Sequence, residues 1–412
     1  MLDAARSDGE VLACYVLDPL LRKSAGPRRL QFLYDSLREL RDGLDGRLLV
    51  TQGRPESRIP ALVTEIGASA VHVSEDFSPF GLRRDAAVRE ALSDVPLEES
   101  GSPYLVSPGR VTKGDGTPYK VFTPFFSAWT EHGWRAPAKT GPDTARWIDP
   151  ADVAGGVDIP SGDAEFDLPA GEAAAHEQWK TFLGSAITDY ADDRNRPDHD
   201  GISRMSAHLK FGTIHPRTMA ADLGNDKGAQ AYLRELAFRD FYAGVLYAWP
   251  DSAWWNWNKS FDRIEVDEDR DAEKRFEAWK AGRTGFPIVD AGMRQLAETG
   301  FMHNRVRMIT ASFLVKDLHL PWQWGARWFL EQLTDGDMAS NQHGWQWAAG
   351  CGTDAAPYFR VFNPTTQGNK FDPDGAYVER WVPEFGGDSY PEPIVDHAAE
   401  RLEALRRYEA IR

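Results

Sequence analysis

The chain is poor in cysteine and has no long apolar run. Its only cysteines, Cys14 and Cys351, lie far apart in the 412 residues. Their spacing fits neither a disulfide framework nor a metal site, so we expect two free, buried thiols and no bound metal. No apolar run reaches the roughly 18–20 residues of a membrane span, and the N-terminus lacks a signal-peptide pattern. We therefore expect a cytoplasmic protein with no membrane partner.

Lysine is also scarce. The chain has 12 lysines against 35 arginines, and its 63 acidic residues give a net charge of −16. Such a charge argues against a nucleic-acid partner unless a basic groove lies within the acidic surface, because phosphate contacts need positive charge. Many acids with few lysines are typical of proteins from salt-loving organisms, where salt screens surface charge. We therefore hypothesise that the protein loses stability in dilute buffer.

Tryptophan is absent from the first 128 residues, and all 15 tryptophans lie at or after Trp129. The early region alternates short apolar segments with amphipathic ones, which predicts a parallel sheet with helices beside it. The first of these segments already has the character of an interior strand, so we expect the sheet to lack its first strand. The predicted strands are 11–17, 47–51 and 70–74, and the predicted helices are 28–44 and 58–66.

The sequence changes between about 131 and 171, where glycine, proline, aspartate and alanine dominate. We predict a loosely packed surface connection there. From Trp179 to Tyr190, apolar residues then keep the spacing of one buried helical face. Similar helical patterns cover 229–248, 290–300, 305–318 and 326–333. The predicted units are an α/β domain at 1–130, a connector at 131–171 and an all-helical domain at 172–412.

The segment 335–364 is the most informative about chemistry. Within 13 positions it has two carboxylates (Asp335, Asp337), an amide (Asn341) and two tryptophans (Trp345, Trp347). An ordinary core segment has no use for that mixture. Polar groups that can bind a heteroaromatic ring, beside indoles that can stack or carry an electron, indicate a bound flat cofactor. Any one of the tryptophans could instead be part of the core, as tryptophan usually is.

Residues 201–206 (GISRMS) precede a predicted helix, and Tyr190 and Arg194 stand shortly before them. Small hydroxyl residues and free backbone N–H groups at a helix start suit a diphosphate. A Ser-x-x-Ser pattern such as Ser203 and Ser206 is more often a simple helix cap.

Two further helices present charged and aromatic side chains together. Glu235, Phe238, Arg239 and Tyr242 share one side of a predicted helix at i, i+3, i+4 and i+7. An acid and an arginine on an aromatic face indicate either a site or a buried ion pair. The second helix begins near a basic patch that could hold phosphate or could be a solvated helix start. This patch consists of Asn304, Arg305, Arg307 and Met308.

Together these motifs resemble the photolyase/cryptochrome family, and most closely its class I cyclobutane pyrimidine dimer photolyases. The resemblance covers about 171–385, and its strongest stretches are WKAGRTGFPIVDAGMR at 279–294, MHNRVRM at 302–308 and the segment 335–364. In the first domain, VFTPF at 121–125 and Trp129 are similar to the end of the family's antenna domain. The resemblance implies a Rossmann-like antenna domain followed by an all-α FAD-binding domain.

The resemblance implies a folded FAD in the helical domain. It leaves open a second, antenna chromophore, a deazaflavin or methenyltetrahydrofolate. Asn341 corresponds to the family residue that faces flavin N5, and an amide there is similar to the repair enzymes. The cofactor carries the redox chemistry, and the protein sets its orientation and electrostatics. By position, the residues around FAD are Tyr190, Ile202, Ser203, Arg204, Met205, Ser206, Tyr232, Arg239, Arg307, Asp335, Asp337 and Asn341.

The implied reaction is light-driven repair of damaged DNA. In the family, excited reduced FAD donates one electron to a pyrimidine dimer flipped out of the duplex, the ring bonds split, and the electron returns. Flipping costs roughly a few kcal/mol, least for a damaged pair. By resemblance, Glu235 hydrogen-bonds a dimer carbonyl, and Trp347 and Phe238 stack on the dimer. The other residues implied to meet the lesion or its phosphates are Arg194, Asn304, Arg305 and Met308.

The chain departs from the family pattern at three places. Phe238 stands where the family usually has tryptophan. Trp345 and Trp322 match the inner positions of the family's electron relay, but its outermost position falls among 267–271, which contain no tryptophan. The arginine-rich first strand of the family's α/β domain is missing, which leaves antenna binding open. We expect the relay to end at another residue, and the candidates are Trp254, Trp255, Trp257 and Trp324.

Three alternatives remain. A cryptochrome-type light sensor would use the same flavin without repair. Such receptors often have a long C-terminal tail, whereas this sequence ends about 30 residues after the WVPE stretch at 381–384. Glu235, Asn341 and Met308 also favour repair. A (6-4) photolyase would be expected to have paired histidines near Asn304, and only His303 is present. The third alternative is a light-independent flavoprotein or nucleotide-binding module. The resemblance therefore implies a monomeric carbon–carbon lyase that acts on pyrimidine dimers and joins the nucleoid when bound to DNA.

Overall fold

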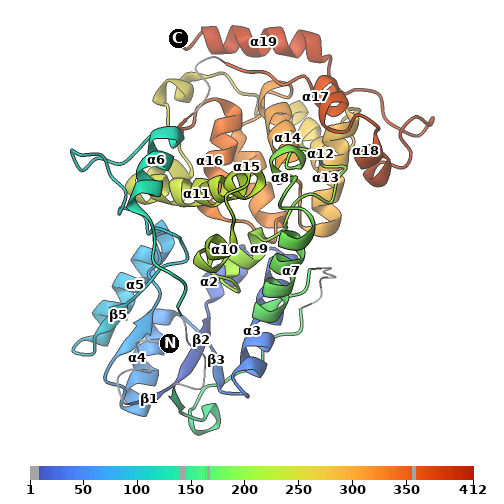
Figure 1. Cartoon of the computed structure of the whole chain (residues 1–412). Helices are drawn as coiled ribbons and strands as arrows, with labels where there is room; N and C mark the ends of the chain where they lie inside the picture. Colours follow the sequence, from blue (N-terminus) through green and yellow to red (C-terminus); the bar gives the residue numbers. More distant parts are fainter. Residues whose placement is uncertain (1–8, 139–144, 163, 165–167, 355–358) are drawn as a thin grey trace.

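The structure is a computed structural model that describes residues 9–138, 145–162, 164, 168–354 and 359–412. Short parallel strands with helices beside them form one end of the molecule, and helices form most of the rest (Figure 1). The predicted order, an α/β domain followed by an all-helical one, is confirmed. In the described ranges no helix combines the length and the apolar character that crossing a membrane requires.

The described strands form three parallel pairs rather than one continuous sheet. In the longest pair Ala13 lies opposite Leu48 and Leu17 opposite Gln52. Ala13, Tyr15 and Leu17 alternate along their strand and face one core. The intervening Cys14 therefore faces the other way and is exposed, contrary to the expected burial, whereas Cys351 is buried as expected. The pairs are β1 (Glu10–Val11) with β6 (Arg146–Trp147), β2 (Ala13–Leu17) with β3 (Leu48–Gln52), and β4 (Val71–Val73) with β5 (Leu97–Glu99).

Each helix of this first part starts at a proline. The fixed φ of proline suits the first helical turn, and its missing N–H has no helical partner there. These positions confirm the predicted helices and strands to within a few residues. The helices are α2 (Pro19–Ser24), α3 (Pro27–Gly43), α4 (Pro55–Ile66) and α5 (Pro79–Leu92).

The segment 131–171 packs more closely than we predicted, where the structure describes it. Its strand β6 pairs with β1, and Gly156 forms an antiparallel bridge with Thr51. Val153 and Ile159 are buried. A glycine- and proline-rich segment that covers a sheet has no periodicity, so the sequence gives no sign of this burial. Residues 139–144, 163 and 165–167 of the connector lie outside the described residues, and the boundaries at 130 and 171 stay a prediction.

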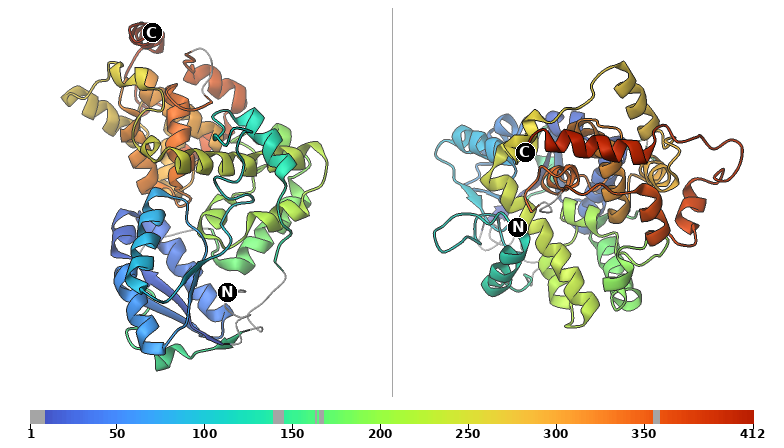
Figure 2. Two further views of the ribbon diagram at one scale, coloured as in Figure 1. Left: turned by 90° about the vertical axis from the view of Figure 1, so that its left-hand side faces the viewer. Right: turned by 90° about the horizontal axis from the view of Figure 1, so that it is seen from above.

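Helix α6 (Phe122–His132) lies on the helical part, away from the strands (Figures 1 and 2). Its Trp129 is fully buried in a core shared with α7 and α11. Asp240 of α11 accepts hydrogen bonds from Trp129 Nε1 at 3.0 Å and from the Val106 amide at 2.9 Å. Burial raises the pKa of Asp240 to about 6, although these bonds and Arg239 oppose the rise. Residues before 130 thus help to build the helical core.

The helices after 170 surround one large core and share a second with α6. The predicted continuous face from Trp179 to Tyr190 is interrupted, because α7 ends at Ser185 and α8 starts at Tyr190. The start of α11 packs against this break, and Gly228 there leaves no space for a Cβ beside the Ile187 carbonyl. The helices are α7 (Gly171–Ser185), α8 (Tyr190–Asp193), α9 (Ser206–Phe211), α10 (Pro216–Asp222), α11 (Lys227–Ala248), α12 (Arg270–Lys280), α13 (Pro287–Thr299), α14 (Asn304–Lys316), α15 (Trp322–Gln332), α16 (Met338–Ala349), α17 (Pro364–Phe371), α18 (Ala376–Trp381) and α19 (His397–Glu409).

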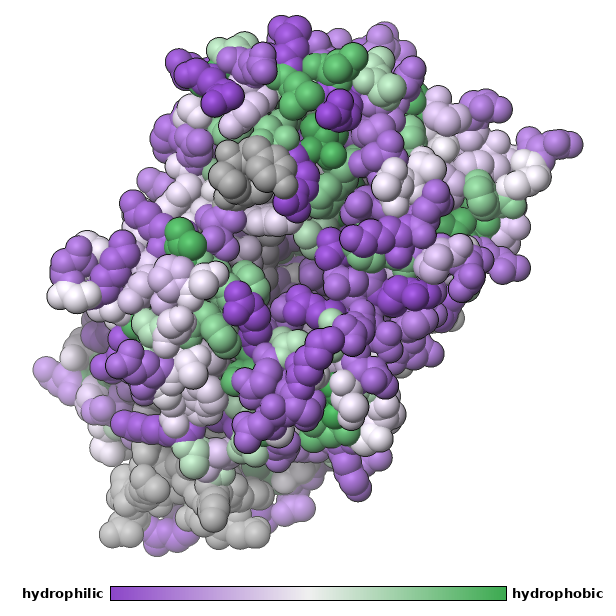
Figure 3. All heavy atoms as spheres, turned by 45° about the horizontal axis from the view of Figure 1, so that its top comes forward, coloured by the Kyte–Doolittle hydropathy of each residue, from purple (hydrophilic) through white to green (hydrophobic). Residues whose placement is uncertain are grey.

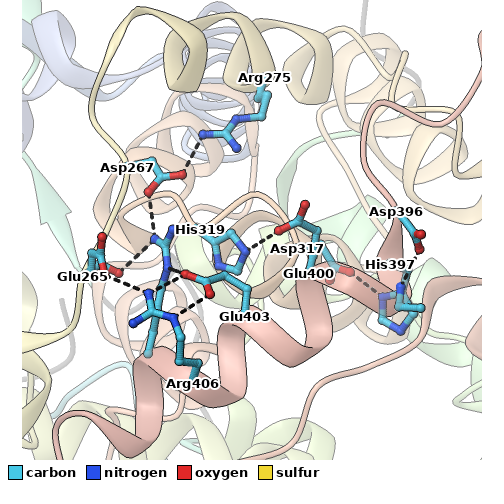
Figure 4. A network of polar contacts seen from close by, with 12 residues as sticks. Glu265, Asp267, Arg275, Asp317, His319, Asp396, His397, Glu400, Glu403 and Arg406 are labelled. Carbon is cyan, nitrogen blue, oxygen red and sulfur yellow. Dashed lines mark hydrogen bonds and ion pairs between the residues drawn. The ribbon is translucent and has the colours of Figure 1, made fainter.

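The C-terminal helix α19 is held largely by polar contacts (Figure 4). Its Arg407 donates to Asp267 at 2.8 Å. Glu400 lies 2.8 Å from the buried His319. The apolar contribution includes Tyr408, whose ring stacks on Phe359 at a centroid distance of 4.5 Å. The other ion pairs of this network are His397–Asp317, Arg275–Asp267, Arg406–Glu265, Arg406–Glu403 and Arg407–Glu403.

Candidate functional site

Two carboxylates occupy the turn between α15 and α16. Asp337 caps α16 and accepts a hydrogen bond from the Ser340 amide at 2.9 Å. Asp335 Oδ2 accepts from Arg307 Nη2 of α14 at 2.9 Å. Its other oxygen, Oδ1, is buried and has no hydrogen-bond partner among the described residues. A buried acceptor without a donor is costly, so this atom indicates where a ligand donor would bind.

Asp337 is kept ionised by two cations. Burial alone would raise the pKa of Asp337, but the charges of Lys210 and Arg239, together with hydrogen bonds from Ser340, hold this pKa below its ordinary value. Lys210 Nζ of α9 lies 3.7 Å from Asp337 Oδ2. Arg239 donates to the Pro103 carbonyl at 2.5 Å and to the Leu209 carbonyl at 3.1 Å. Arg239 therefore anchors main chain from both parts of the molecule while it acts on Asp337 through its charge.

The loop 201–206 lies against buried tyrosines. Ser203 Oγ is 2.8 Å from the hydroxyl of Tyr232, whose ring lies 5.1 Å from that of Tyr190. Ser203 Oγ also accepts from the Met205 amide at 3.3 Å, in a turn that precedes α9. The Met205 side chain belongs to the core, so only its backbone is placed to meet a ligand. The predicted helix cap is wrong, because α9 has Met205 as its N-cap without a side-chain cap bond and Ser206 as its first residue. The predicted ligand loop stays a prediction.

The loop 201–206 also includes a residue in an unusual backbone conformation. Arg204 has φ +52°, in the left-handed region that non-glycine residues rarely adopt. Its guanidinium lies over the Phe301 ring at 5.2 Å. Ile202 is half-buried against the core, and Ser206 begins α9.

The amide of Asn341 is held in one orientation. Its Nδ2 donates to the Ala326 carbonyl of α15 at 3.0 Å and to Gln342 Oε1 at 2.7 Å. Because both bonds use Nδ2, the carbonyl oxygen Oδ1 is the atom available to accept a bond from a ligand.

The predicted relay tryptophans are both buried, and ring contacts extend from one of them. Trp345 meets Trp279 at a centroid distance of 6.1 Å. Trp279 meets Phe276 at 5.8 Å, and Phe276 meets Trp324 at 5.3 Å. Trp322 is fixed by a hydrogen bond from Nε1 to Asn256. These contacts connect Trp345 with Trp324, which is one of the four predicted alternative ends of the relay.

Glu235 of α11 pairs with Arg194, which follows α8. Glu235 Oε1 lies 2.7 Å from Arg194 Nη2, although this contact lacks the angle of a hydrogen bond. Burial raises the pKa of Glu235, and Arg194 opposes the rise. The Glu235 charge also acts on Tyr190 and Tyr232. The sequence left open a buried ion pair between Glu235 and Arg239, but Glu235 pairs with Arg194 instead, and Arg239 binds main-chain carbonyls. The Glu235–Arg194 pair lies beside the tyrosines of the predicted cofactor site.

Arginines gather next to this pair. Arg305 donates from Nε and Nη2 to Asn195 Oδ1, at 3.1 and 2.6 Å. Burial lowers the pKa of Arg305, and the charges of Arg194 and Arg360 lower it further. Arg194, Arg305 and Arg360 thus form a local basic patch, whereas Arg307 of the predicted patch binds Asp335 instead. Such a patch is the electrostatic requirement for binding phosphate groups.

The comparisons with known proteins agree with this arrangement. A family model described as “FAD binding domain of DNA photolyase” matches residues 232–387, and one described as “DNA photolyase” matches residues 1–143. The “Deoxyribodipyrimidine photo-lyase” of Halobacterium salinarum is 37% identical over 100% of this chain and 94% of that protein. This chain belongs to the photolyase/cryptochrome family.

Two solved structures of the photolyase/cryptochrome family are similar to the whole chain. A bacterial class III photolyase from Agrobacterium tumefaciens gives a TM-score of 0.87 at 33% identity, covering 100% of this chain and 94% of the other. A cryptochrome from Synechocystis gives a TM-score of 0.89 at 26% identity, covering 98% and 95%. The class of this chain within the family stays a prediction.

The family's cofactor, FAD, fits the residues of the site. Asp335 Oδ1 is a buried acceptor for which the described part of the chain offers no donor, and Asn341 presents a second acceptor. Arg307 and Lys210 supply positive charge close to the carboxylates, which suits the anionic diphosphate. We therefore assign FAD as the cofactor of this family member, whereas its individual contacts stay predictions.

The remaining predicted lesion residues of this family member surround the start of α14 and the end of α16. Asn304 is exposed at the first position of α14, and Met308 and Trp347 are half-buried. Phe238 stacks on Phe122 of α6, with ring centroids 3.4 Å apart. The predicted sandwich between Phe238 and Trp347 stays a prediction.

His303, the single histidine near Asn304, has a structural position. It is buried and caps α14 by accepting a hydrogen bond from the Arg305 amide at 3.2 Å. Burial lowers the pKa of His303 to about 4, and Arg307 and Arg305 contribute. The imidazole is therefore neutral at pH 7, as expected of a cap and not of a proton donor.

Proposed function

We propose that this chain repairs cyclobutane pyrimidine dimers in DNA by light-driven electron transfer, as a deoxyribodipyrimidine photo-lyase. The observation that supports this most is the Glu235–Arg194 pair, where a half-buried acid stands at the junction of a basic patch and the tyrosines of the flavin site. When bound, reduced FAD absorbs blue or near-UV light, supplies one electron to the lesion and takes it back after the ring bonds have split.

In this proposal each group around the lesion has a separate task. Arg194 and Arg305 bind the phosphates next to the lesion and hold the flipped nucleotides, because guanidinium groups match phosphate oxygens bidentately. Glu235, in its protonated form, donates a hydrogen bond to a dimer carbonyl and stabilises the negative charge that the lesion gains. Trp347 and Phe238 stack on the dimer, and Asn304 and Met308 contact its edges.

The cofactor residues bind and orient FAD. Asp335 and Asn341 accept hydrogen bonds from the flavin, and Asn341 is neutral, so it tolerates a reduced, negatively charged ring. Arg307 and Arg239 balance the charges of Asp335 and Asp337. The remaining members of this cradle are Tyr190, Ile202, Ser203, Arg204, Met205, Ser206 and Tyr232.

The substrate is damaged DNA, and its approach requires a recessed surface. Figure 3 shows one face of the molecule with a hollow near its middle and mixed hydrophilic and hydrophobic side chains around it. We propose that the protein acts as a monomer in the cytoplasm and associates with the nucleoid only through damaged DNA. A second chromophore, a deazaflavin or methenyltetrahydrofolate, stays open.

The test combines a spectrum with a repair assay. Purified protein should have the absorption bands of a flavin, and it should remove thymine dimers from a short duplex under blue light but not in darkness. An undamaged duplex and a photochemically reduced, protein-free flavin solution are the controls. Flavin-loaded protein that leaves the dimers intact in light would favour a cryptochrome-type sensor. Equal repair in darkness would point to a light-independent flavoprotein.

A further inference from the structure

The first turn of α3 breaks the usual rule for charges at helix ends. A helix N-terminus carries partial positive charge, so acidic side chains stabilise it and basic side chains do not. Helix α3 begins with Pro27, Arg28 and Arg29 and has no acidic residue in its first turn. Local rules are broken where another part of the molecule compensates, so these two arginines require partners elsewhere.

Those partners are the C-terminal ends of two helices in the other part of the chain. Arg28 Nη2 donates to the Glu298 carbonyl, at the end of α13, at 2.6 Å. Arg29 reaches the end of α15, where Nε and Nη2 donate to the Leu333 carbonyl at 3.2 and 2.8 Å, and Nη2 also to the Leu330 carbonyl. Helix C-termini have unpaired carbonyls and partial negative charge, so both arginines suit these ends better than their own.

The junction is closely packed, and it includes the turn of the flavin site. The position of a Cβ on Gly26, just before α3, is taken by the Glu331 carbonyl of α15. A Cβ on Gly336 would overlap the guanidinium of Arg29. Because Gly336 separates Asp335 from Asp337, Arg29 lies directly against the main chain that carries both carboxylates.

The charged side chains around this turn also come from both parts of the molecule. Burial lowers the pKa of Arg29, and the neighbouring charges of Asp335 and Asp337 oppose the fall. Asp335 is bound on its other side by Arg307 of α14. The turn is therefore held between an arginine of the helical part and an arginine of the α/β part.

We propose that Arg29 is a positioning residue for the flavin site. It fixes the turn 333–337 so that Asp335 and Asp337 are preorganised to hold FAD, although Arg29 itself does not touch the cofactor. The inference rests on the proposed function and extends it, since it makes cofactor retention depend on a side chain of the α/β part.

The test measures how fast the full-length protein loses FAD. After dilution into flavin-free buffer, the released flavin is followed by its fluorescence, a readout that needs neither light-driven repair nor DNA. Arg29→Met removes the donors to Leu330 and Leu333 and is expected to speed release by about tenfold or more. Arg29→Lys should restore part of the retention, because an ammonium keeps the charge but not the forked geometry. Arg41→Met, in the last turn of the same helix, is the matched control and should release FAD at the wild-type rate.

A folded Arg29→Met protein that loses FAD at the wild-type rate would overturn the inference, and so would equal losses from Arg29→Met and Arg41→Met. If Arg29→Met does not fold, Arg29→Lys is combined with Asp335→Asn. Non-additive effects of the two changes on FAD release would support the coupling, and additive effects would overturn it. If wild-type protein repairs dimers and the Arg29→Met variant releases FAD at the wild-type rate, only this inference is refuted. Wild-type protein that takes up no flavin refutes the proposed function with it.

Discussion

Replacing Glu235 separates its role in repair from its role in structure. Its carboxyl lies 2.7 Å from Arg194, and burial raises its pKa above the ordinary 4.5. A hydrogen bond from Glu235 to the negatively charged dimer is worth about 1.5–3 kcal/mol. We take the lower end, because the Glu235 side chain is 29% exposed and solvent screens it. Because about 1.4 kcal/mol corresponds to a factor of ten, Glu235→Ala should lower the repair yield per absorbed photon severalfold, with a reduction of about tenfold as the upper bound.

The assay compares dimers repaired per photon absorbed by pre-reduced protein, at matched FAD content. Only protonated Glu235 can donate to the dimer, so the wild-type yield should fall as the pH rises through its raised pKa. Glu235→Gln keeps an amide donor that does not titrate, and its yield should change little over the same pH range. An Ala variant with full FAD and an unchanged yield would remove Glu235 from the mechanism.

The other predictions concern the relay, the core and the surface. Trp345→Phe should block photoreduction of the oxidised flavin by an external reductant while sparing repair by protein that is already reduced; photoreduction that survives would disprove the relay. Asp240→Ala should lower the free energy of unfolding by about 2–4 kcal/mol in denaturant titrations, because the Trp129 and Val106 donors lose their buried acceptor. Asp240→Asn, which keeps an acceptor, should cost less, and equal losses would contradict this reasoning. The melting temperature should rise between dilute buffer and molar salt, since salt screens the repulsion that a net charge of −16 produces; full stability in dilute buffer would refute the hypothesis of salt adaptation.

Much of the fold follows from local patterns. The apolar spacing that predicted a helix at 229–248 corresponds to α11, and the strand–helix alternation before residue 74 is present to within a few residues. Local patterns failed where burial comes from distant chain. The buried Ile159 of the connector packs on the core beneath β2 and β3. Because this glycine-rich stretch has no apolar periodicity, its sequence does not predict that contact.

The candidate site shows the same division. Asp337 caps a helix, with Ser340 three residues later, which is a local pattern that a reader of the sequence can find. Arg360 and Asn195 were not predicted as site residues. The charge of Arg360 acts on Arg305, and Asn195 accepts hydrogen bonds from Arg305. Arg29 acts across about 300 residues of sequence, and its only local sign is a cation at the wrong end of a helix. Residues 355–358 of the most informative segment lie outside the described residues.

The position of α6 has a consequence for engineering. Phe122, Phe125 and Trp129 fill the core that α7 and α11 share, so a truncated catalytic fragment starting at 172 would expose that core and leave Asp240 without its donors. A soluble fragment, or a chimera that exchanges light-harvesting domains between relatives, therefore needs its junction upstream of Leu105.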